Sequence, residues 1–124
     1  FGVNELPILL SYFFTIFVFV VIINSFNLID GIDGLAASVA ILIFCHLSYY
    51  FIKTELMVGL LISCSLIGGL LAFLRFNVTK GKRKIFMGDV GSLVVGFLLS
   101  VTVTMVLSSS LDVSFSFGII QKID

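Results

Sequence analysis

Long apolar runs alternate with short polar stretches along this chain. Each run is close to the roughly 20 apolar residues that a helix needs to cross a bilayer. The runs cover about residues 6–23, 35–52, 56–74 and 90–107. Polar residues at 108–112 are expected to end the last run, and Gly68-Gly69 in the third predicts close helix packing. The pattern therefore predicts an all-α fold, a polytopic integral membrane helical bundle with about four transmembrane helices.

The composition supports lipid as the solvent. Hydrophobic residues make up 60% of the 124 residues and charged residues 11%, and the mean hydropathy is +1.27. A water-soluble domain of this size could not bury so much apolar surface. The chain begins at Phe1 without a methionine and stops at Asp124 just after an apolar stretch. We therefore expect residues 1–124 to be the central fragment of one multi-span membrane domain.

A group of polar side chains with a spacing of three lies between the first two runs. Its members are Asn24, Asn27, Asp30 and Asp33. On a helical backbone, residues three apart share a face, so these side chains would form one polar stripe. Carboxylates at membrane depth are costly unless they are paired, hydrated or metal-bound, which makes them functional candidates. Gly31 and Gly34 follow the two aspartates and would let a ligand approach the backbone closely.

Counting the crossings brings a second polar segment to the same membrane face. The second run leads away from the 24–34 segment and the third run returns, so the 75–89 segment emerges beside 24–34. Five of the seven basic residues belong to this second segment: Arg75, Lys80, Lys82, Arg83 and Lys84. Because basic residues concentrate in cytoplasmic loops, we expect this face to be cytoplasmic.

Asp89 begins the fourth run, between Gly88 and Gly91, and joins Asp30 and Asp33 at this face. Aspartates and asparagines at one interface form a hard-oxygen site of the kind that Mg²⁺ prefers, with few carboxylates, substrate phosphates and water. The basic loop would attract an anionic substrate or anionic lipid headgroups. These features together suggest phosphoryl-group chemistry, in which metal and cations neutralise developing charge.

Other interpretations of the same residues stay open. Asp-Gly pairs are also typical of turns between helices, and a basic loop can serve only to fix topology. An ion or proton pathway would place ionisable groups along several spans, whereas here they gather at one face. A non-catalytic channel or assembly subunit would not need glycine-flanked aspartates. The CDP-alcohol phosphotransferase motif is matched only in part, because Ala37 stands where that motif has arginine.

Two motifs carry a more specific resemblance. They are residues 24–36, NSFNLIDGIDGLA, and residues 86–92, FMGDVGS. In this order, with spans between them, they resemble the polyprenyl-phosphate N-acetylhexosamine-1-phosphate transferases. These enzymes belong to glycosyltransferase family 4 and include relatives of phospho-N-acetylmuramoyl-pentapeptide transferase. An upstream aspartate-rich motif and a downstream histidine-rich loop, both expected of the family, are not among these 124 residues.

The resemblance implies a phosphoglycosyl transferase in the bacterial plasma membrane with its active site on the cytoplasmic face. Its cofactor would be Mg²⁺, with Mn²⁺ as a substitute. Its partners would be the bilayer, a UDP-N-acetylhexosamine and a polyprenyl phosphate lipid, with release of UMP. The reaction would initiate cell-envelope glycan synthesis. No nucleic acid is expected to bind, and a homodimer is compatible with the resemblance.

Carried over by position, the resemblance also gives roles to individual residues. Asp89 would be the principal Mg²⁺ ligand, with Asn27 as a further ligand or an orienting group. Asp30 and Asp33 would be the catalytic acidic pair. The substrate-binding residues would be Asn24, Gly31, Gly34, Asn77, Lys82 and Phe86, with the Phe86 ring stacked on uracil. The chain departs from the family between residues 77 and 86, where a short proline-containing link is more usual.

The residues before Asp30 bear on the identity of the sugar. Leu28-Ile29 is more typical of the N-acetylglucosamine branch of the family, whereas the muramoyl-pentapeptide branch more often has Leu-Thr there. We therefore expect transfer of N-acetylglucosamine 1-phosphate, with the muramoyl-pentapeptide transferase as the alternative.

Overall fold

The computed structural model describes the backbone of residues 7–123 and the side chains of residues 7–110. Its described part is built from helices, which are α1 (Ile8–Ile29), α2 (Leu35–Thr54), α3 (Met57–Asn77) and α4 (Gly88–Ile123). Each contains a stretch long and apolar enough to cross a membrane, and in α4 this stretch is Gly88–Ser110. The predicted all-α bundle of four membrane-spanning helices is therefore confirmed.

Two helix ends lie beyond the expected positions. α1 continues past residue 23 to Ile29, so that Asn24 and Asn27 belong to its last two turns. α4 continues through 108–112 to Ile123, and the prediction that these polar residues end the helix was wrong. With 36 residues, α4 is about 54 Å long at 1.5 Å per residue. It therefore exceeds the roughly 30 Å of a hydrocarbon core.

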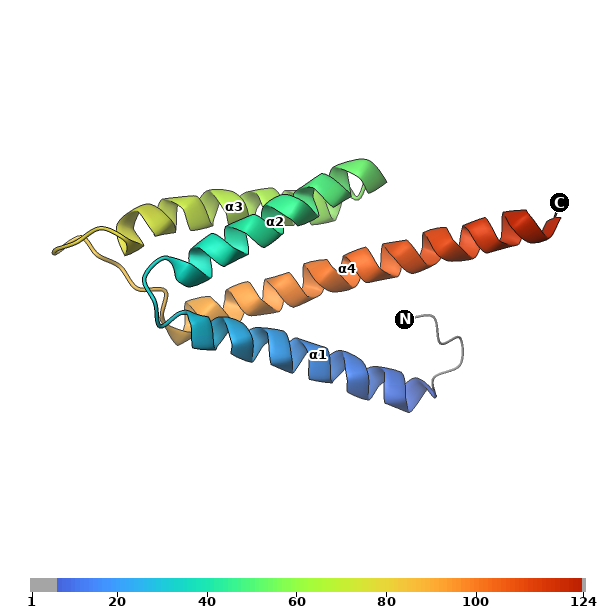
Figure 1. Ribbon diagram of the computed structural model, residues 1–124, viewed down its shortest axis with the longest axis horizontal. Helices are drawn as coiled ribbons and strands as arrows, with labels where there is room; N and C mark the ends of the chain where they lie inside the picture. The colour runs from blue at the N-terminus through green and yellow to red at the C-terminus, as the bar shows by residue number, and fades with distance from the viewer. Residues whose placement is uncertain (1–6, 124) are drawn as a thin grey trace.

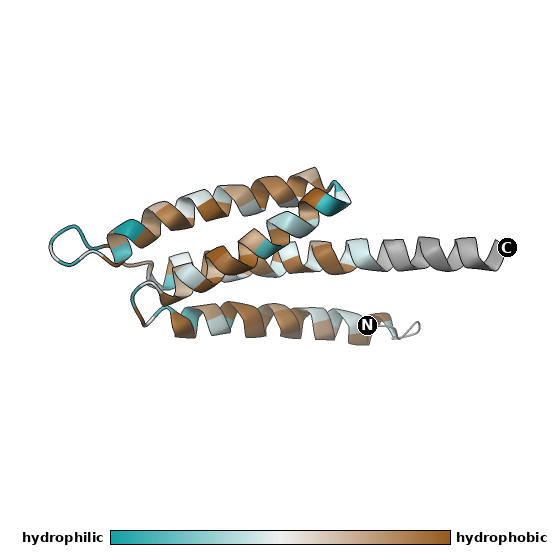
Figure 2. Ribbon diagram, turned by 45° about the horizontal axis from the view of Figure 1, so that its top comes forward, coloured by the Kyte–Doolittle hydropathy of each residue, from teal (hydrophilic) through white to brown (hydrophobic). Residues whose placement is uncertain are grey.

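The helices pack as two antiparallel pairs that share a core (Figure 1). α1 lies along α4, α2 lies along α3, and α2 also contacts α4. The core is centred on α2, where Ala40, Phe44 and Phe51 are fully buried. Hydrophobic residues cover most of the outer faces of the helices as well, as expected for a bundle that meets lipid (Figure 2).

Glycines permit the closest helix contacts, although not at the predicted position. A Cβ on Gly96 of α4 would lie 2.9 Å from the Ile23 Cα of α1, so only glycine allows these backbones to approach so closely. Gly59 of α3 similarly receives the Phe51 ring of α2. A Cβ added to Gly68 or Gly69 would have no neighbour within 4 Å. The prediction that they mark close packing was therefore wrong for the described residues.

The two polar segments meet at one end of the bundle. The turn between α1 and α2 and the loop between α3 and α4 both lie at the left of Figure 1. The short α2–α3 turn lies at the opposite end. Hydrophilic residues mark both ends in Figure 2, and the α3–α4 loop projects furthest from the helices. The convergence predicted by counting crossings is therefore confirmed.

Candidate functional site

The α1–α2 turn depends on Gly34. This residue precedes the first residue of α2 and has a φ of +78°. Residues other than glycine disfavour this left-handed conformation. A Cβ at this position would lie 2.9 Å from Val78 Cγ1 and 3.3 Å from Leu74 Cδ1. Gly34 is therefore required both by its backbone conformation and by the close approach of α3. Gly31, in the same turn, is exposed and needs no positive φ.

Asn77 connects this turn to the α3–α4 loop. Its Oδ1 accepts a hydrogen bond from the Gly34 N–H at 2.6 Å, and its Nδ2 donates to the Ile85 carbonyl oxygen at 3.0 Å. The side chain is buried, with 5% of the residue exposed. Both ends of the amide are thus used within the protein. This arrangement gives Asn77 and Gly34 a structural role, and their contact with substrate stays a prediction.

Asn27 connects α1 to the start of α4. Its Nδ2 donates to Asp89 Oδ1 at 3.3 Å and to Ser92 Oγ at 3.0 Å. Ser92 is completely buried, and its hydroxyl donates to the Asp89 carbonyl oxygen at 3.1 Å. The amide of Asn27 therefore orients the Asp89 carboxylate. Ser92 was not predicted as a site residue, although its position three residues after Asp89 puts both on one face of a helix.

Asp30 lies within reach of the charge on the same carboxylate. The pKa of Asp30 lies above its ordinary value, first because burial removes water from the carboxyl group and second because Asp89 is negatively charged. Two carboxylates that repel each other at the end of α1 and the start of α4 form a place where a cation would be stabilised.

These residues fit a divalent cation that is shared with a substrate. Among residues 7–110, no three His, Cys, Asp or Glu side chains form a ready metal cage. Mg²⁺ often binds through one or two carboxylates and completes its octahedral shell with substrate phosphates and water. Asp89 and Asp30 suit this arrangement. Asn27 turns its donor toward Asp89 and would have to present Oδ1 instead to serve as a ligand.

Asp33, Lys84 and Phe86 form a second group at this end. Lys84 makes an ion pair with the Asp33 carboxylate, and its Nζ lies 5.2 Å from the centroid of the Phe86 ring. Phe86 is 72% exposed, so it is not a core residue. Lys84 lies over this ring, most of whose surface remains exposed, and its stacking on uracil stays a prediction. In the sequence, Lys84 is one of five basic residues of this segment, and nothing in the pattern distinguishes it from the others.

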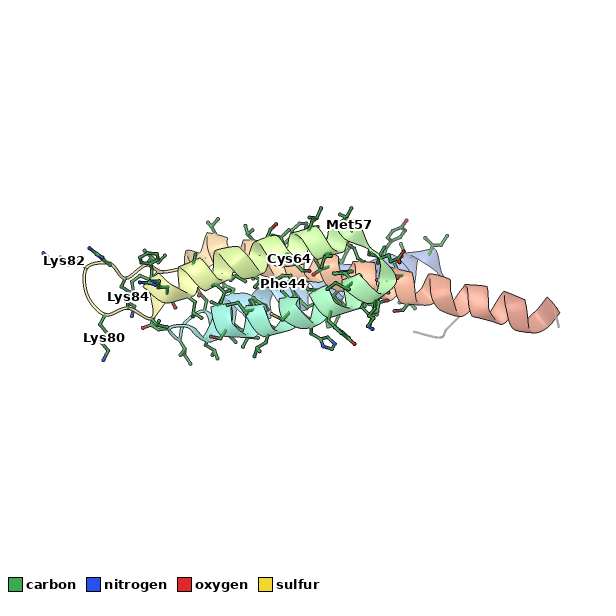
Figure 3. All side chains as sticks on the ribbon, turned by 90° about the horizontal axis from the view of Figure 1, so that it is seen from above. Phe44, Met57, Cys64, Lys80, Lys82 and Lys84 are labelled. Atoms are coloured by element: carbon green, nitrogen blue, oxygen red, sulfur yellow. The ribbon has the colours of Figure 1, made fainter. Side chains whose placement is uncertain are left out.

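Two further predicted substrate-binding residues stand apart from these groups. Asn24 is exposed and donates to the Val20 carbonyl oxygen within its own helix, at 2.8 Å. Lys82 projects with Lys80 at the tip of the α3–α4 loop, while Lys84 lies nearer the helices (Figure 3). The expected stripe is therefore divided: Asn27 and Asp30 face α4, Asp33 faces the loop, and Asn24 joins neither group.

Comparison with known proteins defines the class of this membrane protein. The chain belongs to glycosyl transferase family 4, whose family model matches residues 1–107. The resemblance inferred from the motifs is thus confirmed. A phospho-N-acetylmuramoyl-pentapeptide-transferase of Enterococcus faecalis is 43% identical over 101 residues, which cover 81% of this chain and 31% of the relative.

Other relatives carry the same name. The phospho-N-acetylmuramoyl-pentapeptide-transferase of Clostridium beijerinckii is 36% identical over 118 residues, or 95% of this chain and 33% of that protein. The one of Caldanaerobacter subterraneus is 42% identical over 83 residues, or 67% of this chain and 26% of that protein. The chain therefore spans about a quarter to a third of the length of these relatives. No solved structure matches the chain.

Proposed function

We propose that the protein transfers an N-acetylhexosamine 1-phosphate group from a UDP-sugar to a polyprenyl phosphate in the membrane. The lipid phosphate oxygen would attack the sugar-bearing phosphorus, the bond between the two phosphates of the donor would break, and UMP would leave. The observation that carries this proposal is the Asp89 carboxylate, which Asn27 orients where two membrane-spanning helices meet and whose charge reaches Asp30. Membership of glycosyl transferase family 4 supports it.

The donor that we propose is UDP-N-acetylmuramoyl-pentapeptide. The names of the relatives favour this alternative over the expected N-acetylglucosamine donor. The expectation rested on Leu28-Ile29 alone, of which Leu28 is 81% exposed and Ile29 packs against the hydrophobic core. Ile29 still differs from the Leu-Thr of the muramoyl branch, so UDP-N-acetylglucosamine is the second candidate.

The proposed mechanism divides the work among the residues at this end. When bound, Mg²⁺ (or Mn²⁺ in its place) would neutralise charge on the donor diphosphate. Asp89 and Asp30 would hold it, and Asn27 would keep the Asp89 carboxylate turned toward it. Phe86 would bind the uracil ring by stacking. Asp33 would lie beside the diphosphate, where its charge helps to orient the metal-bound donor.

The basic α3–α4 loop supports a cytoplasmic position for this end. Lys80, Lys82 and Arg83 are exposed there. Basic residues close to membrane-spanning helices are retained on the cytoplasmic side. A nucleotide sugar and a lipid phosphate would therefore meet at the inner surface of the membrane.

The test uses membranes that contain the protein, supplied with polyprenyl phosphate and a donor labelled in its sugar. We expect label to enter the lipid with release of UMP, with Mg²⁺ present and not with excess chelator. UDP-N-acetylmuramoyl-pentapeptide and UDP-N-acetylglucosamine are assayed in parallel, and the donor that is used identifies the sugar. Asp89→Asn membranes are the control for background enzymes. If neither donor labels the lipid above that control, the proposed function is wrong.

A further inference from the structure

Lys84 is distinguished from the other cations of the α3–α4 loop by its neighbours. It makes an ion pair with Asp33, and its Nζ lies 5.2 Å from the centroid of the Phe86 ring. The side chain of Lys84 is 27% exposed. Lys80, Lys82 and Arg83 are exposed, and within residues 7–110 none of them forms an ion pair. One ammonium group therefore lies between a carboxylate of the α1–α2 turn and the exposed aromatic ring of the loop.

The backbone on both sides of Lys84 is held in place. Gly81 has a φ of +110°, which turns the loop back toward the helices, and its carbonyl oxygen accepts a hydrogen bond from the Lys84 N–H at 3.2 Å. The next residue, Ile85, is held through its carbonyl oxygen by the buried Asn77 amide. Lys84 therefore lies between a turn and a residue that is held by a hydrogen bond. Its backbone position is fixed, and from there its side chain reaches Asp33.

We propose that Lys84 is a positioning residue that fixes the Phe86 ring relative to the α1–α2 turn. The inference rests on the proposed function, in which Phe86 stacks on uracil and the acidic residues serve the diphosphate. Phe86 has little packing of its own, because most of its surface is exposed. The attraction of an ammonium group for the face of an aromatic ring orients that ring. The ion pair with Asp33 in turn fixes the ammonium group, so base and diphosphate subsites are held at one spacing.

The alternative role for Lys84 is a direct contact with a donor phosphate. The two roles predict different effects of removing Lys84 on the affinity for uridine. Uridine has the base but no phosphate. If Lys84 acts through Phe86, its removal weakens the binding of uridine as well as that of UDP. If Lys84 binds phosphate, its removal weakens the binding of UDP and leaves uridine unchanged. A role in folding alone would lower thermal stability and leave both affinities of the folded protein unchanged.

The experiment measures the binding of uridine and UDP to the purified protein in detergent by calorimetry, with melting curves for each variant. We expect Lys84→Met to weaken both ligands by about three- to tenfold, the combined scale of an exposed ion pair and an exposed cation–π contact. Lys84→Arg should remain within about twofold of wild type, because arginine keeps the charge and stacks on rings. Lys80→Met, in the same loop, is the matched control and should bind both ligands as wild type does.

A second variant keeps the inference testable if Lys84→Met does not fold. Asp33→Asn removes the other half of the ion pair without touching the base subsite, and it should weaken uridine binding by a similar factor. The double variant should be no weaker than either single one, since both act on one arrangement. Unchanged uridine affinity in either variant would overturn the positioning role alone. Failure of the wild type to bind UDP would instead overturn the proposed function, and the inference with it.

Discussion

The chain reverses its direction at both ends of the bundle, but the surroundings of the two turns differ. At each end the chain reverses through a residue in the left-handed conformation, Gly34 with φ +78° at the site end and Glu55 with φ +57° at the far end. At the site end, comprising residues 27–34 and 77–92, Gly34 is enclosed by Val78 and Leu74. At the far end, comprising residues 49–56 and 104–110, Glu55 is exposed to its surroundings.

The polar contacts differ in the same way. At the far end, Lys53 lies over the ring of Tyr49 within its own helix, and the Tyr50 hydroxyl is 3.0 Å from Ser110 Oγ on α4. At the site end, charged and amide side chains from separate helices meet one another, as in the Asn27 and Lys84 contacts. The far end is closed by contacts that hold helices together. Among residues 7–110, partly exposed carboxylates of several segments come together at the site end, which is what chemistry on a charged substrate requires.

The largest expected effect separates the two ends by activity. Asp89→Asn should reduce sugar-phosphate transfer at least about a hundredfold, the scale of removing one positioned charge from a catalytic site. The matched control is Glu55→Gln, which removes a carboxylate at the far end and should leave the rate unchanged. Initial rates in membranes at saturating Mg²⁺ provide the measurement. Near-normal transfer by Asp89→Asn would remove this residue from the metal site.

A smaller effect concerns the buried amide that joins the two segments of the site end. Asn77→Ala would leave the Gly34 N–H and the Ile85 carbonyl oxygen without their partner. Losing the partner of a buried polar group costs about 1–3 kcal/mol, so the melting temperature in detergent should fall. Asn24→Ala removes an amide of the same size that bonds only within α1, and it should melt close to wild type. Equal melting of the two variants would mean that Asn77 does not join the segments.

The amide residues also illustrate what the sequence could and could not predict. The helices were predictable because each apolar run is long enough to span a bilayer, and the shared end followed from counting crossings. The end of α1 was placed too early because Asn24 and Ser25 remain helical by bonding to the Val20 and Val21 carbonyl oxygens. The serines near the end of the fourth run find a partner in Tyr50, so they do not stop α4.

The partners within the site were predictable only in part. The motifs identified Asn27, Asp30 and Asp89 as candidates for one site. Asn27 does contact Asp89, and the charge of Asp89 reaches Asp30. The partners Lys84 and Ser92 lie 51 and 65 residues from the side chains that they contact. Such pairings depend on how the helices pack and on where the loop turns. A periodic pattern within one segment carries no information about them.

A still smaller effect concerns the stability of the protein, and its sign follows from the pKa of Asp30. Because the folded protein raises this pKa, the folded state holds the proton more tightly than the unfolded chain. The penalty for ionised Asp30 is therefore fully present above the folded pKa and disappears as the pH falls below the ordinary value of 3.8. Asp30→Asn should remove this penalty and raise the melting temperature at pH 7, although transfer activity is lost.

Melting curves of wild type and Asp30→Asn at pH 7 and near pH 4 check this sign. The advantage of the variant should be largest at pH 7 and should shrink as the pH falls toward the ordinary value of 3.8, because protonation of the wild-type carboxyl group removes the penalty. Lower stability of Asp30→Asn at pH 7 would show that the carboxylate is stabilised rather than strained in the folded protein. In that case a cation or a donor already compensates its charge.

The smallest expected effect tests whether the far end is only structural. Glu55 has a φ of +57° at the carboxyl end of α2, where glycine is the preferred residue. Glu55→Gly should relieve the left-handed strain and stabilise the protein by up to about 1 kcal/mol. The transfer rate should not change, because this turn lies at the opposite end of the helices from Asp89. Unfolding and initial rates are measured on the same preparation. A fall in the rate that accompanies the gain in stability would mean that the two ends are coupled through α2 and α3, and the site could no longer be treated as a property of one end.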